Sequence, residues 1–187
     1  MSKTNKSIWQ DIEKSLNELD KQELINLLKN IYEKSTDTEM LINAKFDKKS
    51  KRVLENYRKK IIKAFMTDKE PPELPKIKEG MSAISDYKSA TKDLAGTIDL
   101  IITYSEHAIK YSNELCYDEE DLENSVYDLM QEMKDIILEN KAERYLESFS
   151  DELLKLHKLA DKAEDFMFEA FIGEALEEIG LKESDDE

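Results

Sequence analysis

Nine lysine and arginine residues gather between Lys45 and Lys63, where only Asp47 and Glu55 oppose them. Basic side chains repeated at helical spacing can neutralise phosphates or draw an acidic partner to a surface. Tyr57 lies among them, but the segment has neither a recognition-helix signature nor a set of aromatic residues that could stack on bases. The sequence predicts a candidate interaction surface made of Lys48, Lys51, Arg52, Arg58, Lys59, Lys60 and Lys63.

The two histidines lack the neighbours that metal binding requires. His107 directly follows Glu106. A di-iron helical bundle needs a glutamate three residues before a histidine, but Tyr104 precedes His107 at that spacing and Leu154 precedes His157. We expect His107 to make one hydrogen bond within a helical structure. An enzyme or metal site near Glu106 and His107 is the remoter alternative.

Other residues capable of chemistry do not form a known motif. Cys116 has acidic neighbours, which do not favour the thiolate, so a small buried residue is expected there. The acidic run Asp118–Glu123 has no glycine at the sixth position, where a calcium-binding EF-hand loop needs one. Such a run is typical of a helix N-terminus. The sequence therefore predicts no catalytic residue, no metal ligand and no cofactor.

Composition indicates the kind of scaffold that must position these residues. Of the 187 residues, 40% are hydrophobic and 38% are charged, with four glycines and three prolines. One cysteine excludes an intramolecular disulfide, and no run of about 18 apolar residues offers a membrane span. The opening residues are polar and do not resemble a secretory leader. We expect a cytoplasmic protein with no membrane partner.

Charge is divided unevenly along the chain. The formal net charge is −15, with +5 over residues 1–92 and −20 over residues 93–187. Such asymmetry can steer a partner toward one surface. The simpler interpretation is that charge keeps a small helical protein in solution. In that case the basic face is solvated or paired with the acidic half.

Apolar residues recur at helical spacing, and no strand-like alternation is visible. Asp20 with Glu23 predicts a capping box at a helix start, and Thr36 with Glu39 predicts another. A long helix is expected over residues 92–115, and its run 98–102 is apolar on almost every side, which predicts a central helix covered from both sides. We expect an all-α fold of eight or nine helices. Antiparallel helical hairpins would stack as a short α-solenoid-like superhelix or form an irregular bundle.

All three prolines lie within residues 67–76, which predicts a stiff turn or hinge between helices. We expect a single helical domain over residues 1–180 that contains this turn. An apolar stripe from Leu146 to Met167, spaced alternately by three and four residues, predicts helical structure that packs within the chain. The alternative is a seam that binds a partner or forms a dimer. Residues 181–187 follow Gly180 and are expected to form a disordered acidic tail.

Three stretches of the chain are informative together: VLENYRKKI at 53–61, AISDYK at 83–88 and YSNE at 111–114. With the proline break between the first two, they resemble a bacterial family of small helical proteins, the domain-of-unknown-function family 6155. The likeness covers roughly residues 10–160. It implies a bacterial cytosolic helical array and provides no catalytic residues to transfer.

The sequence predicts many amphipathic helices, an uneven distribution of charge and no catalytic motif. Together these features favour one functional class. We expect a non-enzymatic module that presents a helical groove to a protein or peptide. The first alternative is a nucleic-acid-associated protein that uses the basic helix 45–63. The second is the enzyme or metal protein with a site near Glu106 and His107.

Overall fold

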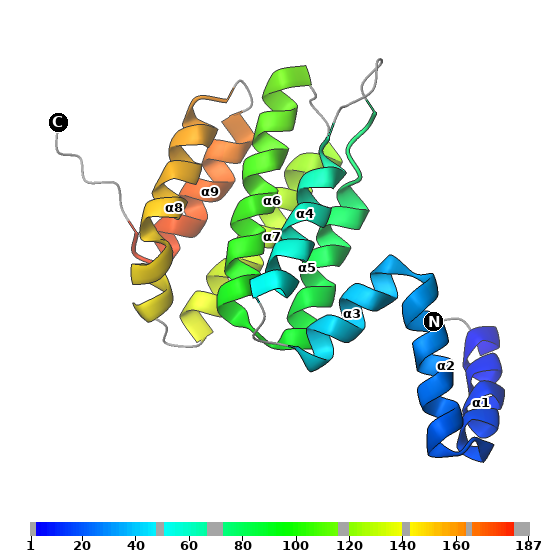
Figure 1. The fold of residues 1–187 in the computed structure, drawn as a ribbon. Coiled ribbons are helices and arrows are strands. Elements are labelled where there is room, and N and C mark those ends of the chain that lie inside the picture. Colours follow the sequence, from blue (N-terminus) through cyan, green and yellow to red (C-terminus); the bar gives the residue numbers. More distant parts are fainter. Residues whose placement is uncertain are drawn as a thin grey trace. The chain divides into compact units, whose positions relative to one another are not determined.

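The computed structural model describes residues 3–47, 51–66, 73–115, 120–139, 143–163 and 166–181. Over these ranges the regular structure is helical, without a strand, which confirms the predicted all-α class (Figure 1). The helices are α1 (Lys3–Glu18), α2 (Lys21–Lys34), α3 (Thr36–Phe46), α4 (Lys51–Ala64), α5 (Ile77–Thr91), α6 (Leu94–Leu115), α7 (Glu120–Glu139), α8 (Glu143–Asp161) and α9 (Phe166–Glu178).

The chain divides into two compact units, residues 1–43 and 44–187. Compactness alone does not show that a unit folds independently, so the single domain expected over residues 1–180 stays a prediction. In the first unit, the two-residue link Leu19–Asp20 joins α1 to α2. The carboxylate of Asp20 accepts a hydrogen bond from the Glu23 amide, and the Asp20 amide donates to the Glu23 side chain, both at 2.8 Å. The predicted capping box is thus confirmed.

The start of α3 differs from the prediction by one residue. The hydroxyl of Ser35 accepts a hydrogen bond from the Thr38 amide at 3.3 Å, so Ser35 caps this helix and Thr36 is its first residue. Serine and threonine are both common caps, and the Glu39 spacing favoured Thr36, although serine is the better cap of the two. Farther along, the Tyr32 hydroxyl bonds to the Asn43 side chain at 3.2 Å and links α2 to α3.

In the second unit, α4 to α9 stack as three successive helix pairs. Each helix packs against helices one or two places away along the chain: α4 against α5 and α6, α6 also against α7 and α8, and α9 against α7 and α8. The helices α4, α6 and α8 therefore form one layer, and α5, α7 and α9 form the other (Figure 1). This is the stacked-hairpin arrangement that the sequence predicts.

α6 is the centre of the second unit. Thirteen of its 22 residues are buried, which confirms the prediction of a helix covered from both sides. The preceding turn contains Lys92, whose φ of 59° ends α5 in the left-handed region. Asp93 then holds the start of α6: one carboxylate oxygen accepts the Gly96 amide at 3.1 Å and the other accepts the Tyr87 hydroxyl at 2.7 Å.

Some predicted features fall outside the described residues. These include Cys116, two of the three prolines and most of the acidic tail, so the hinge and the disorder of the tail stay predictions. The apolar stripe Leu146–Met167 is not a single helix, because α8 ends at Asp161 and α9 begins at Phe166. The buried residues of the stripe, Leu153, Leu156 and Ala160, lie on α8, whereas Ala163 follows that helix and the half-buried Met167 is in α9.

A candidate binding groove beside the basic helix

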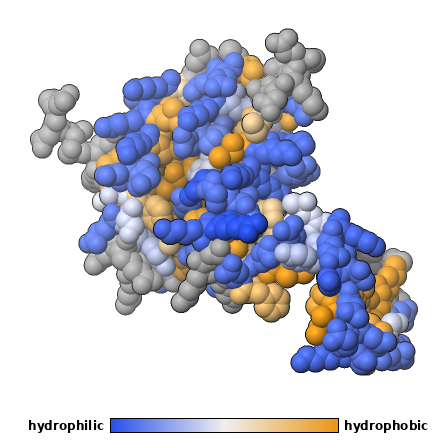
Figure 2. Space-filling model, viewed as in Figure 1, coloured by the Kyte–Doolittle hydropathy of each residue, from blue (hydrophilic) through white to orange (hydrophobic). Residues whose placement is uncertain are grey.

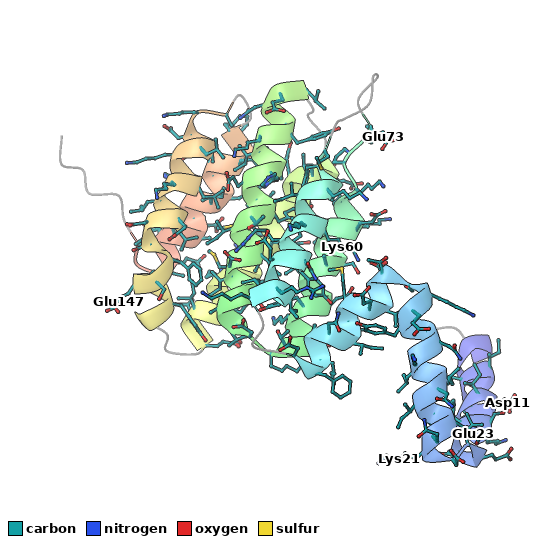
Figure 3. The ribbon with its side chains drawn as sticks, viewed as in Figure 1. Asp11, Lys21, Glu23, Lys60, Glu73 and Glu147 are labelled. Atoms are coloured by element: carbon teal, nitrogen blue, oxygen red, sulfur yellow. The ribbon has the colours of Figure 1, made fainter. Side chains whose placement is uncertain are left out.

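α4 buries one face and presents a basic one. Its buried residues are spaced by four, four and three positions and form one apolar stripe: Val53, Tyr57, Ile61 and Ala64. On the remaining surface Lys51, Arg52, Lys59 and Lys63 are exposed, whereas Arg58 and Lys60 are half-buried. Figure 3 marks Lys60 on this helix. Lys48 lies outside the described residues.

Arg58 is committed to contacts within the chain. Its guanidinium donates to Glu55 Oε2 at 2.6 Å on the same helix and to Asp99 Oδ2 at 2.5 Å on α6. Partial burial lowers the pKa of Arg58, but the two neighbouring carboxylates outweigh it and the pKa lies above its ordinary value. Arg58 therefore holds α4 against α6, and the exposed lysines of α4 are better placed to meet a ligand.

A groove of about 470 Å³ opens at the C-terminal end of α4. We call it the α4 groove. One wall comes from the last turns of α4 and the other from the segment 73–76 that leads into α5. Its lining is formed by Lys59, Ile62, Lys63, Ala64, Met66, Glu73, Leu74 and Lys76. Figure 3 places Glu73 in the segment between α4 and α5.

Two hydrogen bonds hold the walls of the groove. The Lys76 amide donates to the Ala64 carbonyl at 2.9 Å, and the Tyr111 hydroxyl of α6 donates to the Glu73 carbonyl at 2.8 Å. Burial raises the pKa of Tyr111 above its ordinary value, so the phenol keeps its proton and remains a donor. Segment 73–76 is thus attached to both α4 and α6, which gives the groove a fixed width.

The groove combines apolar surface with an excess of positive charge. Met66 and Leu74 are 51% and 68% exposed and both line the groove, so they offer apolar contact area to a ligand. Three lysines stand against the single acidic residue Glu73. Lys76 lies 4.0 Å from Glu79, but Lys59 and Lys63 form no ion pair with the described residues. A complementary ligand would carry carboxylates and a large apolar side chain.

A smaller groove lies between α6 and α8. It measures about 290 Å³ and is lined by Ile102, Glu106, Lys110, Glu152, Lys155, Leu156 and Leu159. Glu106 is ion-paired with Lys110 one turn later on α6. The positive and negative groups here are balanced, so this groove has less charge selectivity than the α4 groove.

Neither histidine lines the α4 groove. His107 Nδ1 is 2.9 Å from the Thr103 carbonyl of its own helix, the single hydrogen bond that was predicted. His157 Nε2 lies 3.5 Å from Glu169 Oε1, across the α8–α9 contact. Among the described residues, no three His, Cys, Asp or Glu side chains are arranged to hold a metal ion.

The sequence pattern identified Lys59 and Lys63 of the α4 groove, but neither Lys76 nor the apolar lining. Met66 directly precedes residues 67–76, where the prolines lie, and Leu74 lies within them, directly before Pro75. Both line the groove because segment 73–76 is hydrogen-bonded to α4. Apolar residues beside the prolines were the available signal.

Comparison with models of protein families, with curated proteins and with solved structures gives no match to this chain. The resemblance to family 6155 stays a prediction. Within the described residues, no helix has the length and apolar character needed to cross a membrane.

Proposed function

We propose that this protein is a non-enzymatic, cytoplasmic interaction module that binds an acidic peptide segment of another protein in the α4 groove. The observation that carries this proposal is the pairing of exposed Met66 and Leu74 with two lysines, Lys59 and Lys63, that have no acidic partner among the described residues. Large apolar side chains provide contact area, and unpaired charges select the sign of the ligand.

A titration with synthetic peptides tests this proposal. The probes are fluorescein-labelled peptides of aspartate and glutamate with one central leucine or phenylalanine, read by fluorescence polarisation. The matched probes replace the acidic residues by lysine, or the apolar residue by serine. We expect the acidic apolar peptide to bind best, with an affinity that falls as salt rises.

Charge reversal locates the site. Lys59→Glu with Lys63→Glu should weaken binding by about tenfold or more. Lys155→Glu with Lys162→Glu makes the same change in net charge elsewhere and should have little effect, since both side chains are exposed on or beside α8. Equal losses in both double variants would point to a non-specific charge effect or to the α6–α8 groove, and would contradict the assignment.

The same lysines support the alternative of nucleic-acid binding, so a labelled duplex and a labelled single-stranded oligonucleotide belong in the same assay. Salt-dependent binding to either one, lost on charge reversal of Lys59 and Lys60 and stronger than peptide binding, would replace the peptide proposal. The net charge of −15 repels a long polyanion more strongly than a short peptide with a few carboxylates, so it favours the peptide.

A further inference from the structure

The helix pair α1–α2 has an apolar surface that its own fold does not cover. Ile8, Trp9 and Ile12 on α1 are between 43% and 56% exposed. On α2 the same holds for four large side chains, which are between 38% and 54% exposed: Ile25, Leu27, Leu28 and Ile31. Figure 2 shows apolar side chains gathered on this helix pair among hydrophilic ones.

The exposed apolar residues of α1 and α2 lie on regular, well-defined helices. At 100° per residue, Ile8, Ile12, Leu16 and Leu19 fall on one side of α1, and they line a shallow depression of about 440 Å³. α2 begins with a complete capping box. Each helix is therefore well specified and carries a defined apolar stripe.

The helix pair nevertheless lacks an interior. From Ile8 to Lys34 no residue is buried. Isolated helices of this length are marginal in water, and units of about 40 residues usually need a disulfide, a metal or association with another chain. The one cysteine lies outside this unit. The stability of this unit therefore requires that the apolar stripes be buried against a further surface.

The low net charge of residues 1–43 makes this unit better suited to self-association than the rest of the chain. Residues 1–43 hold six basic and eight acidic residues, a net charge of −2, whereas residues 44–187 carry −13. Ion pairs within each helix balance the polar faces, at 3.7 Å between Lys14 and Asp11 and at 3.7 Å between Lys29 and Glu33. Two copies of the helix pair can therefore approach with little repulsion.

The exposed area is of the size that a dimer needs. Ile25 lies about 200° around α2 from Leu27 and so falls off the apolar stripe. Half of a large apolar side chain is on the order of 100 Å², so the other six residues offer on the order of 600 Å² per copy. A typical stable interface buries about 800 Å² per partner. We propose that α1 and α2 of two chains associate through these apolar stripes into a four-helix bundle, a common symmetric solution for paired amphipathic helices.

Sedimentation equilibrium of the full chain over a range of concentrations tests the proposal. We expect a reversible change from 21.8 kDa to about twice that mass, the mass of two chains. Trp9 is the one tryptophan of the chain, so its emission should shift to shorter wavelength over the same concentrations. Ile12→Ala with Leu28→Ala keeps good helix formers and should raise the dissociation constant by about tenfold or more.

The matched control is Leu138→Ala, an equally exposed apolar residue on α7, which should leave the mass and the Trp9 emission unchanged. A monomer at every concentration would overturn the proposal, whether Trp9 is solvated or shielded by its own chain. So would a dimer that the α1–α2 variant leaves intact. A Trp9 shift that appears only with anionic phospholipid vesicles would identify a membrane surface as the occupant and would also overturn it.

Discussion

The guanidinium of Arg58 on α4 contacts the carboxylate of Asp99 on α6 at 2.5 Å, across the space between two helices of one layer. The two residues are 41 positions apart in the sequence. Both side chains are about one-third exposed, so solvent weakens the pair without abolishing it.

Separating this pair should destabilise the second unit modestly. We expect Arg58→Ala and Asp99→Asn each to lower the free energy of unfolding by about 1–2 kcal/mol, since a charge-assisted hydrogen bond is lost. In a double-mutant cycle followed by urea unfolding, the coupling should be near 1 kcal/mol. A coupling energy of zero would mean that the contact between Arg58 and Asp99 does not contribute to stability.

Gly96 should not tolerate a side chain. A Cβ at this position would lie 2.3 Å from the Tyr87 hydroxyl and 2.6 Å from Asp93 Oδ2, so it would break the bond that joins these two residues. We expect Gly96→Ala to cost about 2–3 kcal/mol of unfolding free energy.

Gly173 is the control, because its Cβ would meet nothing closer than His157 Nε2 at 3.2 Å. Gly173→Ala lies within a helix and should change the stability by less than about 1 kcal/mol. Adding Tyr87→Phe to Gly96→Ala removes the atom of closest approach and should recover part of the loss. If the two glycine variants were equally stable, the close approach at Gly96 would not matter energetically.

Alkaline pH should destabilise the fold through Tyr104. Burial raises the pKa of Tyr104 from 10.0 to about 12, and its hydroxyl lies 2.8 Å from Ser125 Oγ. Between these values the unfolded chain releases the proton while the folded chain keeps it. The stabilisation is therefore complete below pH 10 and falls by up to about 2–3 kcal/mol as pH rises through 12.

Urea unfolding at several alkaline pH values measures this loss. In Tyr104→Phe the fall should be smaller, although it should not vanish, because burial also raises the pKa of Tyr87 and of Tyr111. Tyr127→Phe, on the exposed side of α7, is the matched control. An unchanged pH dependence in Tyr104→Phe would remove Tyr104 as its source.

The apolar lining of the α4 groove should matter for binding and not for folding. Met66→Ser or Leu74→Ser should weaken binding of the acidic apolar peptide by about tenfold. The free energy of unfolding should change little, because both side chains are exposed. The Leu138→Ser variant, changed at a comparably exposed position outside the groove, should bind the peptide with the affinity of the unsubstituted protein. Loss of stability in parallel with loss of affinity would show a structural role instead.

The sequence pattern was sufficient to predict those parts of the helical fold that local signals determine. The apolar run 98–102 predicted the central place of α6, and the Asp20–Glu23 spacing predicted where α2 begins. The end of α8 at Asp161 could not be predicted, because residues 162–165 contain neither glycine nor proline. α8 and α9 pack against each other, a tertiary contact that no local signal in the sequence reveals.

The candidate site was predictable only in part, for a similar reason. Charge clustering on residues 45–63 indicated Lys59 and Lys63, but it could not separate them from Arg58, whose partner Asp99 is distant in the sequence. Nor could it reveal the bond from Lys76 to Ala64 that forms the groove. Contacts between segments decide which charges of a basic helix remain available.

Each helix from α4 to α9 packs against helices one or two places away along the chain, and this arrangement affects the order in which the second unit folds. Because no helix there must find a partner distant in the chain, the entropy of loop closure is small at each step, and structure can grow outward from α6. A nascent chain could thus assemble α4, α5 and α6 before α9 has been synthesised. Pulse-labelled hydrogen exchange during refolding should find amide protection first in α6 and last in α9; simultaneous protection of all six helices would argue for a single concerted step.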